Sequence, residues 1–484
     1  MLNAQKILLG LKRIYIIVKP TLDLRVYRRG AYIMIGVATL LSILILLPET
    51  MFAAWTYTAP LKMTLLTFTL ILSYFLLNPL IRYIEFKRDL EEETPYLILL
   101  ASSSPSSGDE IGYLMNKISE YSREYRIFTA SRKIAVKARN LARFTGFTEA
   151  LRLMSENILP GMLRKIMRNY LVNRSLGTQR VYLEILLEDI MRELDARYKR
   201  IISAKVSILT MILTVYTIVA IIVTTLSVIY GVYIVMYSET LMLAISLILS
   251  LIIPRHPMPM RIIRRSRIAS LSGYISLSLL ITPAVLILMG SGFKAISSVK
   301  EFVISNLGLY SLAILIASIP SVKLFVDILR ELMLVRNLII GSQSHVRVFK
   351  DLGNFNEDQK LKRSFRTWLS GYILFAMRFM REAGSIASDL YDKFCEKILE
   401  LYSSYRNYMI HNLFSLIIVF MQPLLFSQVA GIIMNKEIII DLSVIALISS
   451  SLVASKILFD ELLNGFIGSL QLIFYLILMG GSLR

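Results

Sequence analysis

The sequence predicts an all-α polytopic membrane protein, with about nine transmembrane helices and two helical-bundle domains in the cytoplasm. Apolar residues make up 55% of the 484 residues, charged residues make up only 18%, and the mean hydropathy is +0.62. A soluble chain of this length would need a larger charged surface. The single cysteine excludes a disulfide scaffold, and the three scattered histidines provide no zinc-ligand spacing.

Segment 1–30 is basic and amphipathic. It contains seven Lys/Arg residues and one acidic residue, and Ile7, Leu8, Leu11 and Ile14 fall on one helical face. We expect a short helix in the membrane interface. A cleaved signal peptide fits less well, because no small-residue cleavage site follows the apolar residues.

Nine apolar stretches are long enough to cross a membrane, because a spanning helix needs roughly 17 to 25 residues. Two lie in 31–81, four in 206–319 and three in 411–484. Two polar blocks, 82–205 and 320–410, separate these groups. The nine stretches are 31–47, 63–81, 206–230, 232–253, 269–289, 302–319, 413–433, 438–455 and 462–479.

The basic residues predict the orientation in the cell membrane. Segments 1–30, 82–205, 254–268, 320–410 and 456–461 contain 49 of the 54 Lys/Arg residues, and the segments on the opposite side contain five. Cytoplasmic loops carry an excess of Lys and Arg. We therefore expect the N-terminus and both polar blocks in the cytoplasm, and the C-terminus outside.

Both polar blocks are expected to be small helical bundles related by an internal duplication. A shift of 207 residues aligns Gly177 with Gly384 and Tyr198 with Tyr405, and each block then leads directly into a membrane helix. A shared order of helical block, glycine, amphipathic helix, tyrosine and membrane entry favours a duplicated unit. The same shift aligns Leu183, Leu187 and Leu194 with Leu390, Phe394 and Leu401.

No motif in the sequence predicts a catalytic reaction. The sequence has no Gly-x4-Gly-Lys-Ser/Thr phosphate loop and no His-Glu-x-x-His zinc motif. We therefore expect neither an enzyme nor a cofactor or metal site. Ionisable residues in the spans are few: Glu239, Glu437, Asp441 and the pair Asp460 and Glu461 all fall near predicted helix ends, where solvated side chains are the simplest expectation.

The first polar block resembles a known family. Glu93-Thr-Pro95 opens it, and Gly108, Gly146-Phe-Thr-Glu-Ala-Leu151, Pro160 and Gly177 follow in order. This pattern is similar to the F domain of type II secretion systems. The nine-span layout resembles the archaeal versions, which are the archaellum and archaeal pilus platforms. The second block is shorter and lacks the Gly-x-x-x-Ala-Leu helix.

The resemblance implies an inner-membrane platform for a type IV pilus-like filament. A hexameric cytoplasmic secretion ATPase would dock under it, and pilin-like subunits would be lifted from the bilayer into the filament. The family also implies a homodimer in contact with membrane lipids. Gln422 and Pro423 are candidates for a kinked, apolar groove that receives a pilin helix, and Glu239 is a candidate contact. Ordinary packing is the alternative for these residues.

Two basic clusters are the candidate docking surface. In the first block, spacings of three or four predict many basic residues on one side of a helix. Contact with anionic lipid headgroups, docking to an acidic ATPase surface and nucleic-acid binding are the competing interpretations, and the last is weakest because no aromatic platform is interleaved. The clusters are Arg123, Arg126, Arg132, Lys133, Lys137, Arg139 and Arg143, and the loop residues Arg261, Arg264, Arg265 and Arg267.

The alternative class is a permease subunit of an ATP-driven transporter. It would also have about nine spans and an internal repeat, but it predicts charged or polar groups near the bilayer midplane. Because such charge is nearly absent from the predicted spans, the sequence favours the platform, with no enzymatic activity and no nucleic-acid partner.

Overall fold

The computed structural model describes ten segments of the chain. They are 85–104, 110–157, 161–230, 232–263, 266–292, 305–344, 366–384, 389–432, 436–460 and 464–482. These segments are almost entirely helical (92%) and contain no β-strand, which confirms the all-α prediction for this part of the chain. The predicted amphipathic segment 1–30 and the first two predicted spans lie outside the described residues.

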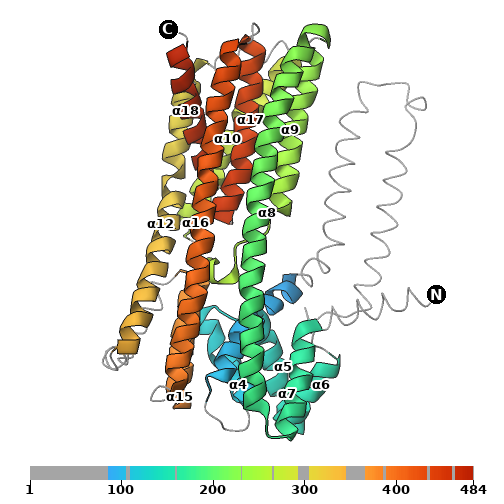
Figure 1. Ribbon diagram of the computed structural model, residues 1–484, viewed down its shortest axis with the longest axis vertical. Helices are drawn as coiled ribbons and strands as arrows, with labels where there is room; N and C mark the ends of the chain where they lie inside the picture. Colours follow the sequence, from blue (N-terminus) through green and yellow to red (C-terminus); the bar gives the residue numbers. More distant parts are fainter. Residues whose placement is uncertain are drawn as a thin grey trace, which may run out of the picture. The chain divides into compact units, whose positions relative to one another are not determined.

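The chain divides into two units. The first unit holds most of the first polar block and extends to Ile185, and the second holds the chain from Leu186 onward together with 103–105 and 124–127. The first unit consists of a helix at 85–102, α4 (Glu110–Tyr125), α5 (Thr129–Thr145), α6 (Phe147–Asn157), α7 (Gly161–Ser175) and the start of α8 (Gln179–Tyr230) (Figure 1).

Glycines end two helices of the first unit. Gly146 follows α5 with φ 82°, and Gly177 follows α7 with φ 73°. Only glycine adopts this left-handed conformation without strain from a Cβ atom, so both positions stop a helix and turn the chain. The helices between them pack through one apolar face each, as with Leu163, Ile166 and Tyr170 of α7.

The second unit is a bundle of apolar helices. Five of its helices are long and apolar enough to cross a membrane, namely α8, α10, α12, α16 and α17, and α9 and α18 are shorter apolar helices. These seven coincide with the last seven predicted spans, whereas a total of nine stays a prediction. The bounds are α9 Val232–Ile252, α10 Arg267–Gly292, α12 Leu307–Ser344, α15 Trp368–Ala383, α16 Asp389–Ile432, α17 Lys436–Phe459 and α18 Phe466–Ser482.

Helix α17 is the most enclosed helix of this bundle. In its most apolar stretch, 94% of the residues are buried, against 33–39% in the other four long helices. It packs against α9, α10, α16 and α18 (Figure 1). The other four therefore present apolar surface outward, as membrane helices do, while α17 forms the centre.

Three helices continue across the predicted edges of the membrane segments. Helix α8 extends unbroken from Gln179 to Tyr230, α16 from Asp389 to Ile432, and α12 from Leu307 to Ser344 through Pro320. At 1.5 Å per residue, α8 is roughly 78 Å long. Each is one continuous helix that joins a polar block to an apolar stretch of the sequence.

A side chain of α18 replaces a hydrogen bond that a proline removes from α16. Pro423 has no N–H, so the carbonyl of Val419 one turn earlier loses its helical hydrogen bond. The side-chain amide of Gln471 in α18 donates to this carbonyl at 3.0 Å. Such replacement partners are what make proline tolerable in membrane helices. Beside it, Gln422 is fully buried and its amide has no hydrogen-bond partner among the described residues.

We expect Gln471→Leu to destabilise the bundle by about 1 kcal/mol, because the Val419 carbonyl would be left buried and unpaired. In a Pro423→Ala background the main-chain N–H at position 423 is restored, so the same change should cost less. Denaturation of the four proteins in detergent measures the coupling between the two sites. An equal loss in both backgrounds would contradict this compensation.

Candidate functional site

The carboxylate of Glu93 lies buried at the N-terminus of α5. It accepts hydrogen bonds from the main-chain N–H groups of Ala130 (3.1 Å) and Ser131 (2.6 Å), and from the Ser131 hydroxyl. Helix-start N–H groups have no partner within the helix, and the helix dipole favours a negative charge there. Phe128, the residue before α5, provides no side-chain cap. Glu93 therefore supplies the cap from another helix.

Burial and hydrogen bonding have opposite effects on the pKa of Glu93. Burial raises the pKa of Glu93 to about 7, while its hydrogen bonds with Ser131 and Ala130 act to lower it.

Glu331 lies in a comparable place in the second unit, just before α15, although the side chain that caps this helix is that of Thr367. Its carboxylate accepts the main-chain N–H groups of Arg366 (2.9 Å) and Thr367 (2.9 Å) and the hydroxyls of Thr367 and Ser370, at the start of α15. In both units the glutamate bonds the hydroxyl of a threonine 36 residues later: Glu93 with Thr129, and Glu331 with Thr367.

A glycine with positive φ follows each of these two helices. Gly146 closes α5 with φ 82° and Gly384 closes α15 with φ 75°. The separation from Thr129 to Gly146 equals the separation from Thr367 to Gly384. A buried glutamate at the helix start, a helix and a glycine with positive φ thus recur with unchanged spacing in the two polar blocks.

Five residues of the first basic cluster share α5, on the side opposite its buried residues, as predicted. Arg123 instead ends α4, and Arg126 lies in the connection that belongs to the second unit. The five are Arg132, Lys133, Lys137, Arg139 and Arg143, and the buried residues of α5 are Ala130, Ser131, Ile134, Ala135 and Ala138.

These basic side chains differ in their exposure and in their ion pairing. Lys133 and Arg143 are exposed. Arg139 forms an ion pair with Glu120 at 3.4 Å. Lys137 is half-buried, and burial together with the nearby charge of Lys133 lowers its pKa. Arg143 is therefore the position where a charge change tests the surface with least effect on the interior, whereas the Lys133 ammonium also lies over the ring of the buried Phe86, 5.4 Å from its centroid.

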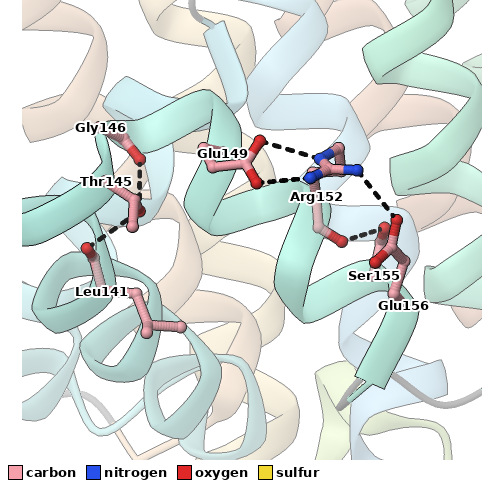
Figure 2. Close-up of polar contacts among 7 residues, drawn as sticks. All are labelled: Leu141, Thr145, Gly146, Glu149, Arg152, Ser155 and Glu156. Carbon is pink, nitrogen blue, oxygen red and sulfur yellow. Dashed lines mark hydrogen bonds and ion pairs between the residues drawn. The ribbon is translucent and has the colours of Figure 1, made fainter.

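In α6, the helix after α5, the basic side chain is paired with acidic side chains of the same helix. Arg152 of α6 pairs with Glu149 at 2.7 Å and with Glu156 at 3.5 Å (Figure 2). Because all three side chains are well exposed, the pairs add little stability, but they leave α6 without net positive charge. Of these two consecutive helices, only α5 therefore presents a basic surface.

The basic loop lies against the start of α15. The N–H of Ile263 donates to the Arg366 carbonyl at 2.7 Å, and the N–H of Trp368 donates to the Arg261 carbonyl at 2.9 Å. Arg267 is exposed at the start of α10. Arg264 and Arg265 lie outside the described residues.

The groove candidates lie on two helices that each pack against α17. Gln422 and Pro423 are buried in α16. Glu239 is 1% exposed and lies within α9 rather than at its end, so the expectation of a solvated side chain is wrong for this residue.

Sequence reasoning missed a buried polar network at the C-terminus of α17. Lys205 donates to the Tyr408 hydroxyl at 2.6 Å, and the same hydroxyl lies 2.7 Å from Nδ1 of His256. The main-chain N–H of His256 donates to the Asp460 carboxylate at 2.7 Å, and Asp460 forms an ion pair with Lys456. We call these five residues the polar junction.

The polar junction caps α17. Nε2 of His256 lies 3.1 Å from the Leu458 carbonyl, and Nζ of Lys205 lies 3.3 Å from the Ile457 carbonyl. Carbonyls in the last turn have no helical partner, and the negative end of the dipole favours a cation. Since a carbonyl only accepts, we assign the histidine proton to Nε2, so that Tyr408 donates to Nδ1.

The charge states in the junction follow from burial and neighbours. Burial lowers the pKa of His256 to about 3, and the charge of Lys205 acts in the same direction. Burial of Asp460 acts to raise its pKa, but His256 and Lys456 outweigh this, and the pKa lies below its usual value. His256 is therefore neutral and Asp460 ionised at neutral pH.

The expectation of a solvated side chain is also wrong for Asp460, which is 2% exposed. A signal was present in the sequence, because Lys456 and Asp460 lie four residues apart with opposite charges at the end of an apolar stretch. Lys205 and His256 gave no such signal, since their partners are more than 150 residues away.

In comparisons with known proteins, the chain matches no family model, no curated protein and no solved structure. The fold and the junction together define the class as a helical membrane protein, whose long apolar helices meet around one buried helix.

We expect acid to destabilise the junction through His256. Its folded pKa of about 3 lies below the unfolded value of 6.5, so its contribution is complete above pH 6.5 and falls with pH down to about 3. From pH 6.5 to 5 the loss is about 2 kcal/mol. His256→Gln, which keeps one donor and one acceptor, should show a shallower pH dependence in detergent unfolding. Parallel pH profiles would contradict the assignment.

We expect Glu93→Gln to weaken α5 by about 2 kcal/mol, because an amide NH2 would face main-chain N–H donors. Hydrogen exchange at Ala130 and Ser131 measures the effect. Glu91→Gln is the matched control on the same helix, since the exposed pair of Glu91 with Lys87 at 3.9 Å contributes little. Equal exchange in the two variants would show that Glu93 does not cap α5.

Proposed function

We propose that the protein is the inner-membrane platform of a type IV pilus-like filament, a mechanical coupler between a hexameric cytoplasmic secretion ATPase and pilin-like subunits. The observation that carries the proposal is the pairing of two unbroken helices, α8 and α16, each of which leads from a polar block into the apolar bundle.

The contact between these helices supports an internal duplication. The hydroxyls of Tyr198 and Tyr405 lie 3.3 Å apart, with ring centroids 5.4 Å apart. These residues are equivalent under the shift that aligns Gly177 with Gly384. Where two related copies pack about a twofold axis, a residue on that axis meets its own equivalent. The tyrosine pair therefore supports two copies of one unit, joined face to face.

The capped helices support the same duplication and explain the shorter second block. One constant shift relates Glu93, Thr129 and Gly146 to Glu331, Thr367 and Gly384, and it is larger than the shift that relates the long helices. The difference between the two shifts equals the length of segment 147–177, which contains α6 and α7. We infer that the second copy lacks the equivalent of this helical pair, so that α15 leads directly to α16.

The arrangement suits transmission of motion rather than bond chemistry. A continuous helix transfers a displacement along its length, and the polar junction bonds Lys205 of α8 and Tyr408 of α16 to the end of α17. A displacement of α8 or α16 would thus be transmitted to α17 at the centre of the bundle. In this proposal the polar blocks are cytoplasmic, the C-terminus is outside, and the platform is a homodimer in contact with lipid.

One observation favours the permease alternative. Glu239, 1% exposed within an apolar helix, is the kind of group that marks ion pathways in transporters. Loss of solute uptake into vesicles in Glu239→Gln, without an effect on filament assembly, would favour the permease.

The proposal predicts that charge reversal on α5 weakens binding of the secretion ATPase. We expect Lys133→Glu/Arg143→Glu to lower ATPase capture by the full-length protein at least tenfold, because docking uses opposite charges. Membrane insertion should be unchanged, since both side chains are exposed. Arg330→Glu/Arg381→Glu makes the same change of charge at exposed positions of the second block and should bind as the wild type does. Equal capture by all three proteins would overturn the α5 assignment.

A further inference from the structure

The tip of the helical hairpin formed by α7 and the start of α8 exposes large apolar side chains. Val172 and Leu176 are 59% and 69% exposed, and Val181 and Ile185 are 58% and 59% exposed. Each pair is spaced by four residues, so its members lie about one turn apart on one side of the hairpin; Leu176 lies just after α7, with its N–H bonded to the Val172 carbonyl at 3.3 Å. We call these four residues the hairpin tip.

The hairpin tip lies on a well-ordered turn. Gly177 adopts φ 73°, and Thr178 bonds to Asn173 through both its N–H (2.9 Å) and its hydroxyl (3.0 Å to Oδ1). Further along, the Tyr182 hydroxyl donates to the Ile166 carbonyl at 3.4 Å and joins the two helices. The exposed apolar groups are therefore held in place around the turn by the fold.

Core packing does not account for these side chains. The buried residues of α7 are Leu163, Ile166, Met167 and Tyr170, which lie on the opposite face from Val172 and Leu176. On α8, Leu183 is 1% exposed and points inward while its neighbours Val181 and Ile185 do not. A cluster of outward apolar groups on a polar unit marks an interaction site.

The surroundings of the hairpin tip are basic. Segment 161–185 contains five Lys/Arg residues and one acidic residue, Glu184. Lys165 and Arg168 are exposed and share the outer face of α7 with Val172 and Leu176, since the four follow one another at intervals of three or four residues. One stripe thus changes from basic to apolar toward the tip.

The second block is different at the comparable place. Under the shift that aligns Gly177 with Gly384, Ile185 corresponds to Asp392, which is exposed and charged. A long helix that starts after a left-handed glycine therefore has no structural need for an apolar residue there. The apolar tip belongs to the block that contains the additional α6–α7 pair.

We infer that the hairpin tip, with Lys165 and Arg168, is a docking surface for an acidic protein surface that has an apolar recess. Complementary charge would set register and encounter rate, and the apolar residues would supply most of the affinity. A second copy of this chain would bring the same basic stripe and repel it. The inference rests on the proposed function in taking the secretion ATPase as the partner.

The test measures binding of the purified hexameric ATPase to the full-length protein in nanodiscs. Replacing all four tip residues by serine (Val172→Ser, Leu176→Ser, Val181→Ser and Ile185→Ser) should weaken binding at least tenfold. The matched variant, with Val172→Ile, Leu176→Met, Val181→Ile and Ile185→Leu, keeps the apolar surface and should bind within twofold of the wild type. Lys165→Glu/Arg168→Glu should also weaken binding and reduce its dependence on salt.

The outcomes separate this inference from the proposed function. If the wild type and the serine variant bind the ATPase equally, the hairpin tip is not the docking surface, while the platform proposal stands. If the wild-type protein binds no ATPase, the proposed function and the inference both fail.

A second readout distinguishes a protein partner from a lipid surface. Cys395, the single cysteine, is buried, so Cys395→Ser provides a background for a fluorophore at Leu176→Cys. We expect its emission to shift to the blue when ATPase is added and to be the same in zwitterionic and anionic nanodiscs without ATPase. A shift that follows lipid charge with no ATPase present would overturn the inference in favour of the membrane surface.

Discussion

The pairing of the last carbonyls of α17 is the constraint on which the bundle depends. Ile457 and Leu458 are buried away from water, so their carbonyls must find hydrogen-bond partners within the protein. Lys205 and His256 bond to the carbonyls of Ile457 and Leu458, and Tyr408 joins the two side chains. This one network fastens α8, α16 and the segment after α9 to the centre of the bundle.

The same principle operates at the helix starts and within the membrane. Glu93 pairs N–H groups in the first turn of α5, Glu331 pairs those of the two residues just before α15, and Gln471 pairs the carbonyl that Pro423 leaves open. Each is a buried polar side chain that reaches from another helix to an unsatisfied main-chain group. The helices are consequently fixed to one another at their ends and interruptions, where sliding would break a hydrogen bond. Such connections suit a protein whose proposed role is to pass on movement.

Local patterns predicted much of this fold. The long apolar stretches of α8, α10, α12, α16 and α17, and the basic side of α5, depend on composition and helical periodicity, which the sequence carries directly. Apart from the Lys456–Asp460 pair, the polar junction could not be predicted, because its other side-chain bonds join residues 152 to 252 positions apart. Glu93 was recognised as part of a motif, but its role as a cap was not. The matching spacing of Glu331 and Thr367 was present in the sequence and would have indicated it.

The central claim is that the chain works between a secretion ATPase and pilin-like subunits. The most direct test is to purify the tagged full-length protein from gently solubilised native membranes and identify its companions by mass spectrometry. We predict that a secretion-type ATPase and a short pilin-like protein co-purify with it. Recovery of a transport ATPase together with a solute-binding protein would contradict the platform function and favour a permease.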